Sequence, residues 1–443
     1  MDIKYEKVKE VGLSLDFKTI LLAFALFFYL YSVNFAFLPT YTARIIVGLG
    51  LVYVFLVAFQ NRFPRFSSEL LPVLILFFVY FLWAFLGATL DGFSDPSLVI
   101  SAALLFFQSF IGAVVFVVAF FNLKYSFRDV ILILQITVVV QACFVILYFV
   151  SWDFREWTFS NVPIGGNIDP TKNLFRSRGL THSGGATLAL MQAIGLLFTA
   201  YLVTNVRYRR GQFFYLILSF GLIFISIFLT GRTGLLMLPA VFLFFFFVTM
   251  LKGRLLKNIW FFVLIVPLGG VIGILLLKVA YYQILGGFST SWGSDGFDQL
   301  VSWVVSEFVS DDGKIQSRTA DILMDHWFFP MDSKTFFLGS PSTWNVNAIP
   351  SDIGIVRLWH GVGLIGMLMF YAIFFVIFLV TWIKQEGLSE KLLVLFLFLF
   401  LFFTELKEPF LLKLNINSFL SILFFYTLIR WRRIKEKKEI LHS

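Results

Sequence analysis

Twelve apolar stretches, each of roughly 17 to 25 residues, follow one another along this chain at nearly regular intervals. A helix needs about 20 such residues to cross about 30 Å of hydrocarbon. Hydrophobic residues make up 59% of the chain and charged residues only 14%, so lipid is the solvent that explains the composition. Backbone groups in lipid must pair internally, and the stretches lack the alternation of barrel strands. The sequence therefore predicts an all-α fold: one polytopic membrane bundle of about twelve transmembrane helices over residues 1–443.

The basic residues between the predicted helices indicate how the chain crosses the membrane. The predicted helices cover residues 19–38, 44–60, 69–89, 98–121, 130–150, 184–205, 213–230, 235–251, 259–280, 355–382, 392–406 and 410–429. If they alternate in direction, Lys and Arg collect on one side, for example at Arg62, Arg207, Lys252 and in the tail 430–443. The positive-inside rule makes that side the cytoplasm, where both termini are then predicted. The net charge of +9 thus reflects topology and contact with anionic membrane lipids, and we expect no nucleic-acid partner.

Motifs that bind metals or cofactors are missing from the sequence. It has a single cysteine, Cys143, and four scattered histidines, and it contains neither H-E-x-x-H nor a Walker A motif. Residues 361–366 spell G-x-G-x-x-G, but no strand precedes them, so a dinucleotide site is rejected. These glycines instead favour a close approach of helix backbones. We expect no metal and no cofactor.

Two long connections lie on the side opposite the basic residues. They cover residues 152–183 and 281–354, whereas the connections on the basic side are short. Within the longer one, apolar residues recur at helical spacing over 297–308, and a second short helix is predicted over 317–328. Such segments are typical of amphipathic helices that lie on the bundle or at the lipid interface. The working parts of the protein are therefore expected to face outward.

Five arginines are predicted on this outward side, where arginine is normally scarce. They are Arg176, Arg178, Arg232, Arg318 and Arg357. Arg232 lies between two apolar runs with almost no loop, and an arginine at that depth costs a few kcal/mol unless it is paired. A pyrophosphate would satisfy several guanidinium groups at once. The alternative is that they extend to lipid headgroups or pair with acids such as Asp321 and Asp352.

Three groups of residues in this order resemble a known family. The first is Arg176-Ser-Arg178-Gly-Leu-Thr-His182, before a helix, and the second is Thr230-Gly-Arg232-Thr-Gly-Leu-Leu, between two helices. The third comprises Ser317-Arg318-Thr-Ala-Asp321, then Leu338-Gly339, then Ser351-Asp352-Ile-Gly-Ile-Val-Arg357 leading to Gly363-Leu-Ile-Gly366. Over about residues 170–370, the chain resembles the superfamily of O-antigen polymerases and O-antigen ligases, which are bacterial membrane glycosyltransferases.

The resemblance implies a metal-independent enzyme with a GT-C-like bundle in the bacterial inner membrane. Such an enzyme transfers a glycan from undecaprenyl pyrophosphate to an acceptor sugar at the periplasmic face, and a chain-length-regulating membrane protein is a possible partner. Ligases of the superfamily carry a His-Asn pair about eleven residues before the final G-x-x-G, where this chain has Asp352. This difference favours a polymerase, which extends another lipid-linked repeat, over a ligase that delivers polymer to lipid A core.

The predicted mechanism needs a stabilised leaving pyrophosphate and a base for the acceptor hydroxyl. Arg232 and Arg318 are assigned to the pyrophosphate, with Arg176, Arg178 and Arg357 in support. A desolvated Asp352 is the first candidate for the base and Asp321 the second, unless either one only pairs with an arginine. A rival hypothesis is a flippase for lipid-linked oligosaccharides, which would place charged residues in the middle of its helices.

Overall fold

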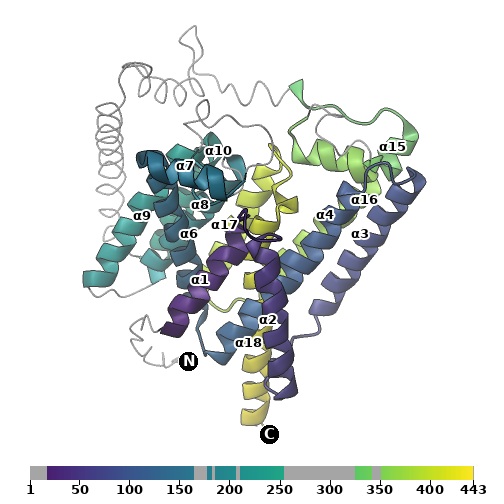
Figure 1. Cartoon of the computed structure of the whole chain (residues 1–443). Helices are drawn as coiled ribbons and strands as arrows, with labels where there is room; N and C mark the ends of the chain where they lie inside the picture. Colours follow the sequence, from purple (N-terminus) through teal and green to yellow (C-terminus); the bar gives the residue numbers. More distant parts are fainter. Residues whose placement is uncertain are drawn as a thin grey trace, which may run out of the picture.

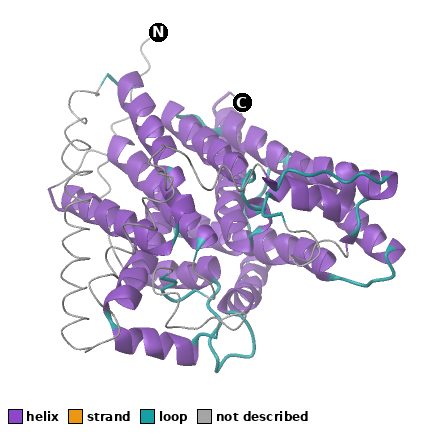
Figure 2. Ribbon diagram, turned by 90° about the horizontal axis from the view of Figure 1, so that it is seen from above, coloured by secondary structure: helices purple, strands orange, loops and turns teal. Residues whose placement is uncertain are grey.

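The computed structural model describes residues 17–163, 177–181, 185–205, 210–253, 325–341 and 351–442, and every regular element in these ranges is a helix. Figures 1 and 2 show the helices as one bundle. They are α1 (Phe17–Tyr31), α2 (Thr42–Phe59), α3 (Leu70–Leu90), α4 (Ser97–Leu104), η1 (Leu105–Ile111), α5 (Gly112–Asn122), α6 (Phe127–Val150), α7 (Trp152–Asn161), α8 (Ala186–Asn205), α9 (Arg210–Thr230), α10 (Arg232–Leu236), α11 (Leu238–Leu251), α15 (Ser333–Leu338), α16 (Gly354–Lys384), α17 (Leu388–Thr404), η3 (Phe410–Leu412) and α18 (Leu414–His442). The all-α prediction is confirmed for these residues.

Eight helical stretches of the described chain are long and apolar enough to cross a membrane. They coincide with predicted spans 2 to 8 and 10, and α17 and α18 coincide with the last two. The first prediction, residues 19–38, is wrong beyond Tyr31, where α1 ends. The predicted span 259–280 and the predicted short helix over 297–308 lie outside the described residues. The same holds for residues 317–324 of the short helix predicted over 317–328, and of its last four residues only Asp325 is helical. The structure therefore supports a polytopic membrane protein of at least eight apolar helices.

Helix α8 forms the centre of the bundle, and its residues from Leu188 to Thr204 are all buried. It packs against α6, α9, α10 and α11. Gly195 allows the closest approach, because a Cβ atom there would overlap the side chain of Val138 in α6. By contrast, α2 and α3 expose apolar side chains such as Phe55 and Phe78, as expected of surfaces that face lipid.

The span from Ser97 to Asn122 crosses the bundle as α4, η1 and α5, and η1 is a π-helix. An inserted residue of this kind often marks a functional position in a helix. The Tyr29 hydroxyl donates to the carbonyl oxygens of Gln108 (3.1 Å) and Ser109 (2.7 Å). The Ser109 hydroxyl in turn donates to the carbonyl oxygen of Leu414 at 2.8 Å. The π-helical turn is thus fixed by α1 on one side and by α18 on the other.

Helix α16 is interrupted at Gly363, whose backbone has φ 69° and ψ 176°. The chain that follows α15 crosses at this point, so that Gly339 and Gly363 lie in backbone contact. Further along α16, a Cβ atom at Gly366 would lie 2.7 Å from Trp83 of α3. The expected close approach is therefore confirmed at Gly366 between two helices, whereas at Gly363 the partner is a turn.

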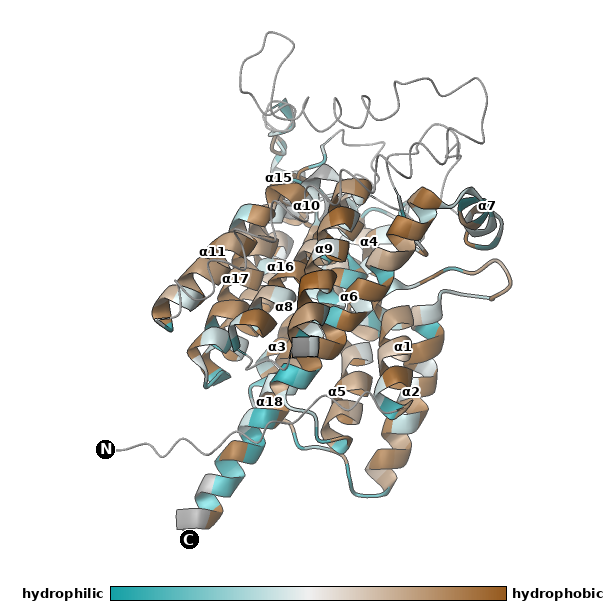
Figure 3. Ribbon diagram, turned by 90° about the vertical axis from the view of Figure 1, so that its left-hand side faces the viewer, coloured by the Kyte–Doolittle hydropathy of each residue, from teal (hydrophilic) through white to brown (hydrophobic). Residues whose placement is uncertain are grey.

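The two ends of the bundle differ in polarity. Figures 1 and 3 show α7, α10 and α15 at one end, which we call the α10 end, and the polar second half of α18 projecting from the other, the tail end. At the tail end Arg430 pairs with Glu390 at 2.8 Å, and Lys384 pairs with Glu69. These ion pairs join α3, α16, α17 and α18. The predicted basic tail 430–443 therefore belongs to the extension of α18, of which residues up to 442 are described.

Candidate functional site

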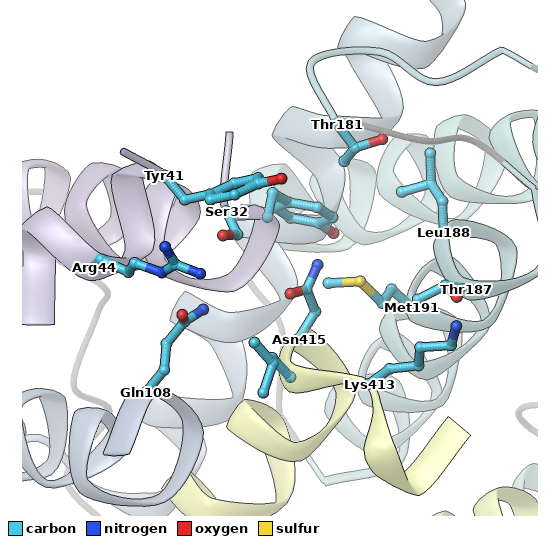
Figure 4. Close-up of a pocket in the computed structure, with 12 residues that line it drawn as sticks. Ser32, Tyr41, Arg44, Gln108, Thr181, Thr187, Leu188, Met191, Lys413 and Asn415 are labelled. Carbon is cyan, nitrogen blue, oxygen red and sulfur yellow. The ribbon is translucent and has the colours of Figure 1, made fainter. Parts of the chain in front are cut away.

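A cavity of about 330 Å³ lies where α1 ends and where α2, α8 and α18 begin, at the α10 end of these helices (Figure 4). The π-helical turn η1 closes it from a further side. Its lining residues are Tyr31, Ser32, Tyr41, Arg44, Gln108, Thr181, Thr187, Leu188, Met191, Lys413, Leu414 and Asn415. Segments far apart in the sequence thus meet around one space of a size found in small-molecule sites.

Two cationic side chains, Arg44 and Lys413, line this cavity and approach it from opposite sides in Figure 4. Arg44 is exposed, donates to the Thr40 hydroxyl at 3.3 Å and lies over the Tyr41 ring at 5.2 Å. Lys413 is half-buried. Within the described chain, no carboxylate lies within salt-bridge distance of either cation. Lys413 does interact electrostatically with Glu405 and Glu408, but neither carboxylate is close enough to form an ion pair with it. The cavity therefore offers two cationic groups that can bind an anion.

A second group of charges lies in the connection from Glu405 to Lys413, between α17 and α18. Glu405 is only 1% exposed, and its two carboxylate oxygens accept hydrogen bonds from the Leu411 backbone N–H (2.6 Å) and the Tyr371 hydroxyl (3.0 Å). Burial raises the pKa of Glu405 to about 8. Burial also raises the pKa of Glu408, although the neighbouring Lys413 and Lys407 oppose this shift. Two carboxyl groups with raised pKa values therefore lie beside the segment that supplies Lys413 to the cavity.

The predicted residue Arg232 begins α10, directly beside this connection. The next residue, Thr233, accepts a hydrogen bond from the Lys407 ammonium group at 2.7 Å. Gly234 packs against α8 so closely that a Cβ atom would lie 2.7 Å from the Ala189 carbonyl oxygen. The structure thus places the backbone of Arg232 next to the charged connection. The Arg232 side chain, Arg176, Arg318 and Asp321 lie outside the described part of the chain.

Arg178 is described, and its guanidinium group binds backbone carbonyl oxygens of the protein itself. It is 3% exposed and donates to Val162 at 2.8 Å and to Thr158 at 2.9 Å. The Phe159 ring lies 4.8 Å away. The carbonyl oxygen of Arg178 accepts a hydrogen bond from the hydroxyl of Thr181, which lines the cavity. In this arrangement Arg178 holds α7 against the cavity wall instead of lining the cavity.

Asp352 and Arg357 lie together at the start of α16. Arg357 is attracted electrostatically by Asp352 and Glu408, which fits the alternative role of an acid as the partner of an arginine. The Asp352 side chain is exposed, so our expectation that it is desolvated is wrong. The residues on either side, Ser351 and Ile353, are buried, so only the Asp352 side chain reaches the surface. The desolvated carboxyl groups are those of Glu405 and Glu408.

Five residues of the site were not predicted from the sequence: Arg44, Gln108, Lys413, Glu405 and Glu408. A usable signal existed for four of them. Residues 405–413 place four charges between two apolar runs, and alternation of the helices puts this connection and Arg44 on the outward side. For Gln108 the only signal is a polar side chain in an apolar span.

No protein-family model matches this chain, and a search of curated proteins finds no significant match. Among the described residues, no three His, Cys, Asp or Glu side chains gather closely enough to hold a metal ion. The function must therefore be argued from the arrangement of the cavity and of the charged connection beside it.

Proposed function

We propose that this protein is a membrane glycosyltransferase that polymerises O-antigen or a related surface polysaccharide. It would transfer a growing glycan from undecaprenyl pyrophosphate to the non-reducing end of another lipid-linked repeat, at the periplasmic face of the bacterial inner membrane. The observation that supports this proposal is the cavity at the α10 end of an apolar bundle. Arg44 and Lys413 line it, and within the described chain no carboxylate lies within salt-bridge distance of either.

A diphosphate attached to a lipid fits this position for two reasons. Its charge would be balanced by a guanidinium group and an ammonium group, which form short hydrogen bonds with phosphate oxygens. Its polyprenyl chain would remain among apolar helices, since α2 and α3 expose side chains such as Phe55 and Phe78. In the proposal, Arg232, Arg357, Arg318 and Arg176 also bind the diphosphate, whereas Arg178 holds α7 against the cavity wall.

The proposed reaction forms one glycosidic bond and breaks one bond to phosphate. The acceptor hydroxyl oxygen attacks the anomeric carbon, undecaprenyl pyrophosphate leaves with its bonding electron pair, and a carboxylate takes the hydroxyl proton. The cations stabilise the negative charge that grows on the leaving diphosphate. Glu408 is our first candidate for the base, because it is half-buried beside Lys413 and burial raises its pKa. Asp352, the first candidate from the sequence, becomes the second, because its side chain is exposed.

The charge distribution supports an enzyme more than a flippase. In the eight described candidate spans, every Asp, Glu, Lys and Arg lies within one turn of a helix end, as Arg44 and Arg357 do. A flippase that passes a diphosphate through the bilayer would place charged groups in the middle of its helices. The described spans carry charged residues at their ends only, although buried glutamines such as Gln135 and Gln192 lie within them.

The test uses purified full-length protein and lipid-linked repeats in detergent. A polymerase yields longer lipid-linked glycans, and Arg44→Gln combined with Lys413→Gln should abolish the extension. The matched control is Arg62→Gln, because Arg62 follows the opposite end of α2 and lies outside the cavity. Unchanged glycan length with the wild-type protein would refute the proposal.

Cells that lack the gene distinguish a polymerase from a ligase. Single repeats on the lipid A core would indicate a polymerase, whereas an unmodified core with accumulated lipid-linked polymer would indicate a ligase.

A further inference from the structure

Two polar groups of the cavity wall have no hydrogen-bond partner within the described chain. The residue Gln108 is 6% exposed, and its amide faces the cavity without a hydrogen bond to any described residue. Tyr31 is 1% exposed, and its hydroxyl also has no hydrogen-bond partner in the described chain. Buried polar groups are nearly always hydrogen-bonded in proteins, and an unpaired one is costly. Both residues line the cavity, so a bound molecule can supply the missing hydrogen bonds.

The π-helical turn explains why Gln108 faces the cavity. The backbone at Gln108 and at the following residue is fixed, because Tyr29 donates to the carbonyl oxygens of Gln108 and Ser109. Ser109 is committed to α18 through its hydrogen bond to Leu414. Ser109 thus has a structural role, whereas the amide of Gln108 faces the cavity, as Figure 4 shows. The turn is held by α1 and α18, so the side chain is presented in a fixed position.

The chemistry of the wall indicates what the ligand contains. An amide donates and accepts, and the hydroxyl of Tyr31, the hydroxyl of Thr187 and the amide of Asn415 add further neutral hydrogen-bonding groups. Sugar hydroxyl groups are matched by such a set, because each of them also donates and accepts. Arg44 and Lys413 border the same space, so one ligand that satisfies all of these groups joins a sugar to a phosphate. The volume of about 330 Å³ is at the small end for ligand sites and suits one sugar rather than an oligosaccharide.

We propose that Gln108 determines specificity by binding the sugar attached directly to the diphosphate of the lipid-linked substrate. This inference rests on the proposed function, since it names the part of the substrate that the same cavity recognises. Gln108 would bind the sugar while Arg44 and Lys413 bind the diphosphate. The two contributions are separable, because removing the Gln108 amide leaves both cations in place.

The experiment measures binding to the full-length protein in nanodiscs. The probes are a short-chain polyprenyl diphosphate without sugar and a panel of the same lipid, each member carrying one monosaccharide. The wild-type protein should bind at least one glycosylated probe about 10-fold more tightly than the sugar-free probe. Gln108→Met, which keeps an unbranched side chain of similar size, should lose that preference and keep its affinity for the sugar-free probe.

Gln192→Met is the matched control. Gln192 is also a buried glutamine whose amide has no partner among the described residues, but it lies in α8 outside the cavity. This variant should keep the preference for the glycosylated probe. Thermal unfolding of both variants verifies that they fold, and Gln108→Leu is the second variant if Gln108→Met does not.

Each outcome has a distinct meaning. If the wild-type protein binds all probes equally, or if the Gln108 variants keep the preference, the specificity role is refuted and the diphosphate site stands. If no diphosphate probe binds, the proposed function itself fails.

Discussion

A methyl group at Gly363 would test the crossing that fixes the α10 end of α16. The backbone there has φ 69° and ψ 176°, a region that only glycine enters easily and that costs other residues about 1–3 kcal/mol. An ideal Cβ atom would overlap the carbonyl group of Phe337 and lie 2.6 Å from the backbone nitrogen of Gly339. These neighbours are backbone atoms, so they cannot move aside by changing a rotamer.

Two hydrogen bonds hold the crossing and would be strained by any shift. The Ser340 backbone N–H donates to the His360 carbonyl oxygen at 2.7 Å, and the Trp83 indole N–H donates to the Val362 carbonyl oxygen at 2.9 Å. Losing both would cost about 1–3 kcal/mol at about 0.5–1.5 kcal/mol each. Together with the backbone strain, Gly363→Ala should lower the free energy of unfolding by about 2–6 kcal/mol.

The assay is reversible denaturation in mixed micelles, followed by tryptophan fluorescence. Gly48→Ala in α2 is the control, because a Cβ atom there meets no heavy atom within 4 Å. Alanine favours a helix over glycine by about 0.8–1.0 kcal/mol, so this variant should be unchanged or slightly more stable. Equal unfolding free energies for Gly363→Ala and Gly48→Ala would refute the close crossing.

Three further predictions follow from the site. Burial raises the pKa of Glu405 from its ordinary value of 4.5 to about 8, so folding favours the neutral carboxyl group. Its contribution to the free energy of unfolding is fully present below about pH 4.5 and is lost as the pH rises through about 8. Glu405→Gln should flatten this pH dependence in thermal unfolding curves. Arg44→Gln and Lys413→Gln should each weaken diphosphate binding about 10-fold in a titration at low salt, whereas Arg62→Gln should leave it unchanged. Equal losses of affinity in all three variants would mean that the diphosphate is attracted nonspecifically by the net charge of the protein. Tyr29→Phe should lower the free energy of unfolding by about 1–3 kcal/mol, since it removes the donor to the π-helical turn, and a change under about 0.5 kcal/mol would contradict that role.

Hydropathy predicted the helices well where a span begins and ends with a change in composition. It failed at the end of α1, because the residues after Tyr31 are still apolar. Ser32 there has φ 46°, and the chain leaves the helix. The backbone N–H of Ala36 then donates to the Asn161 carbonyl oxygen at 2.8 Å, and that of Thr42 donates to the Val33 carbonyl oxygen at 2.9 Å. Tertiary partners replace the helical hydrogen bonds, and composition does not reveal such partners.

The arginines on the outward side were predictable as a group, but their roles were not. Arg178 satisfies its guanidinium group with the carbonyl oxygens of Val162 and Thr158, which only become neighbours once α7 folds. Arg44 and Lys413 meet around one cavity although most of the chain separates them in the sequence. The charge of a residue can be read from the sequence, whereas the partner that neutralises it depends on the packing of the helices.

The buried glutamines show how a structural polar residue differs from one available to a ligand. Gln135 is fully buried, but its amide donates to Thr199 at 3.3 Å and accepts from the Tyr215 hydroxyl at 2.7 Å, so it joins three helices. Gln192 has no partner among the described residues and does not line the cavity, so a missing partner alone indicates no site. A glutamine available to a ligand must also line a cavity. Gln108 does so, and its amide forms no hydrogen bond within the described chain. A π-helical insertion shifts the following residues by about 100° around the helix without changing composition, so the face that a glutamine presents follows only from the folded backbone.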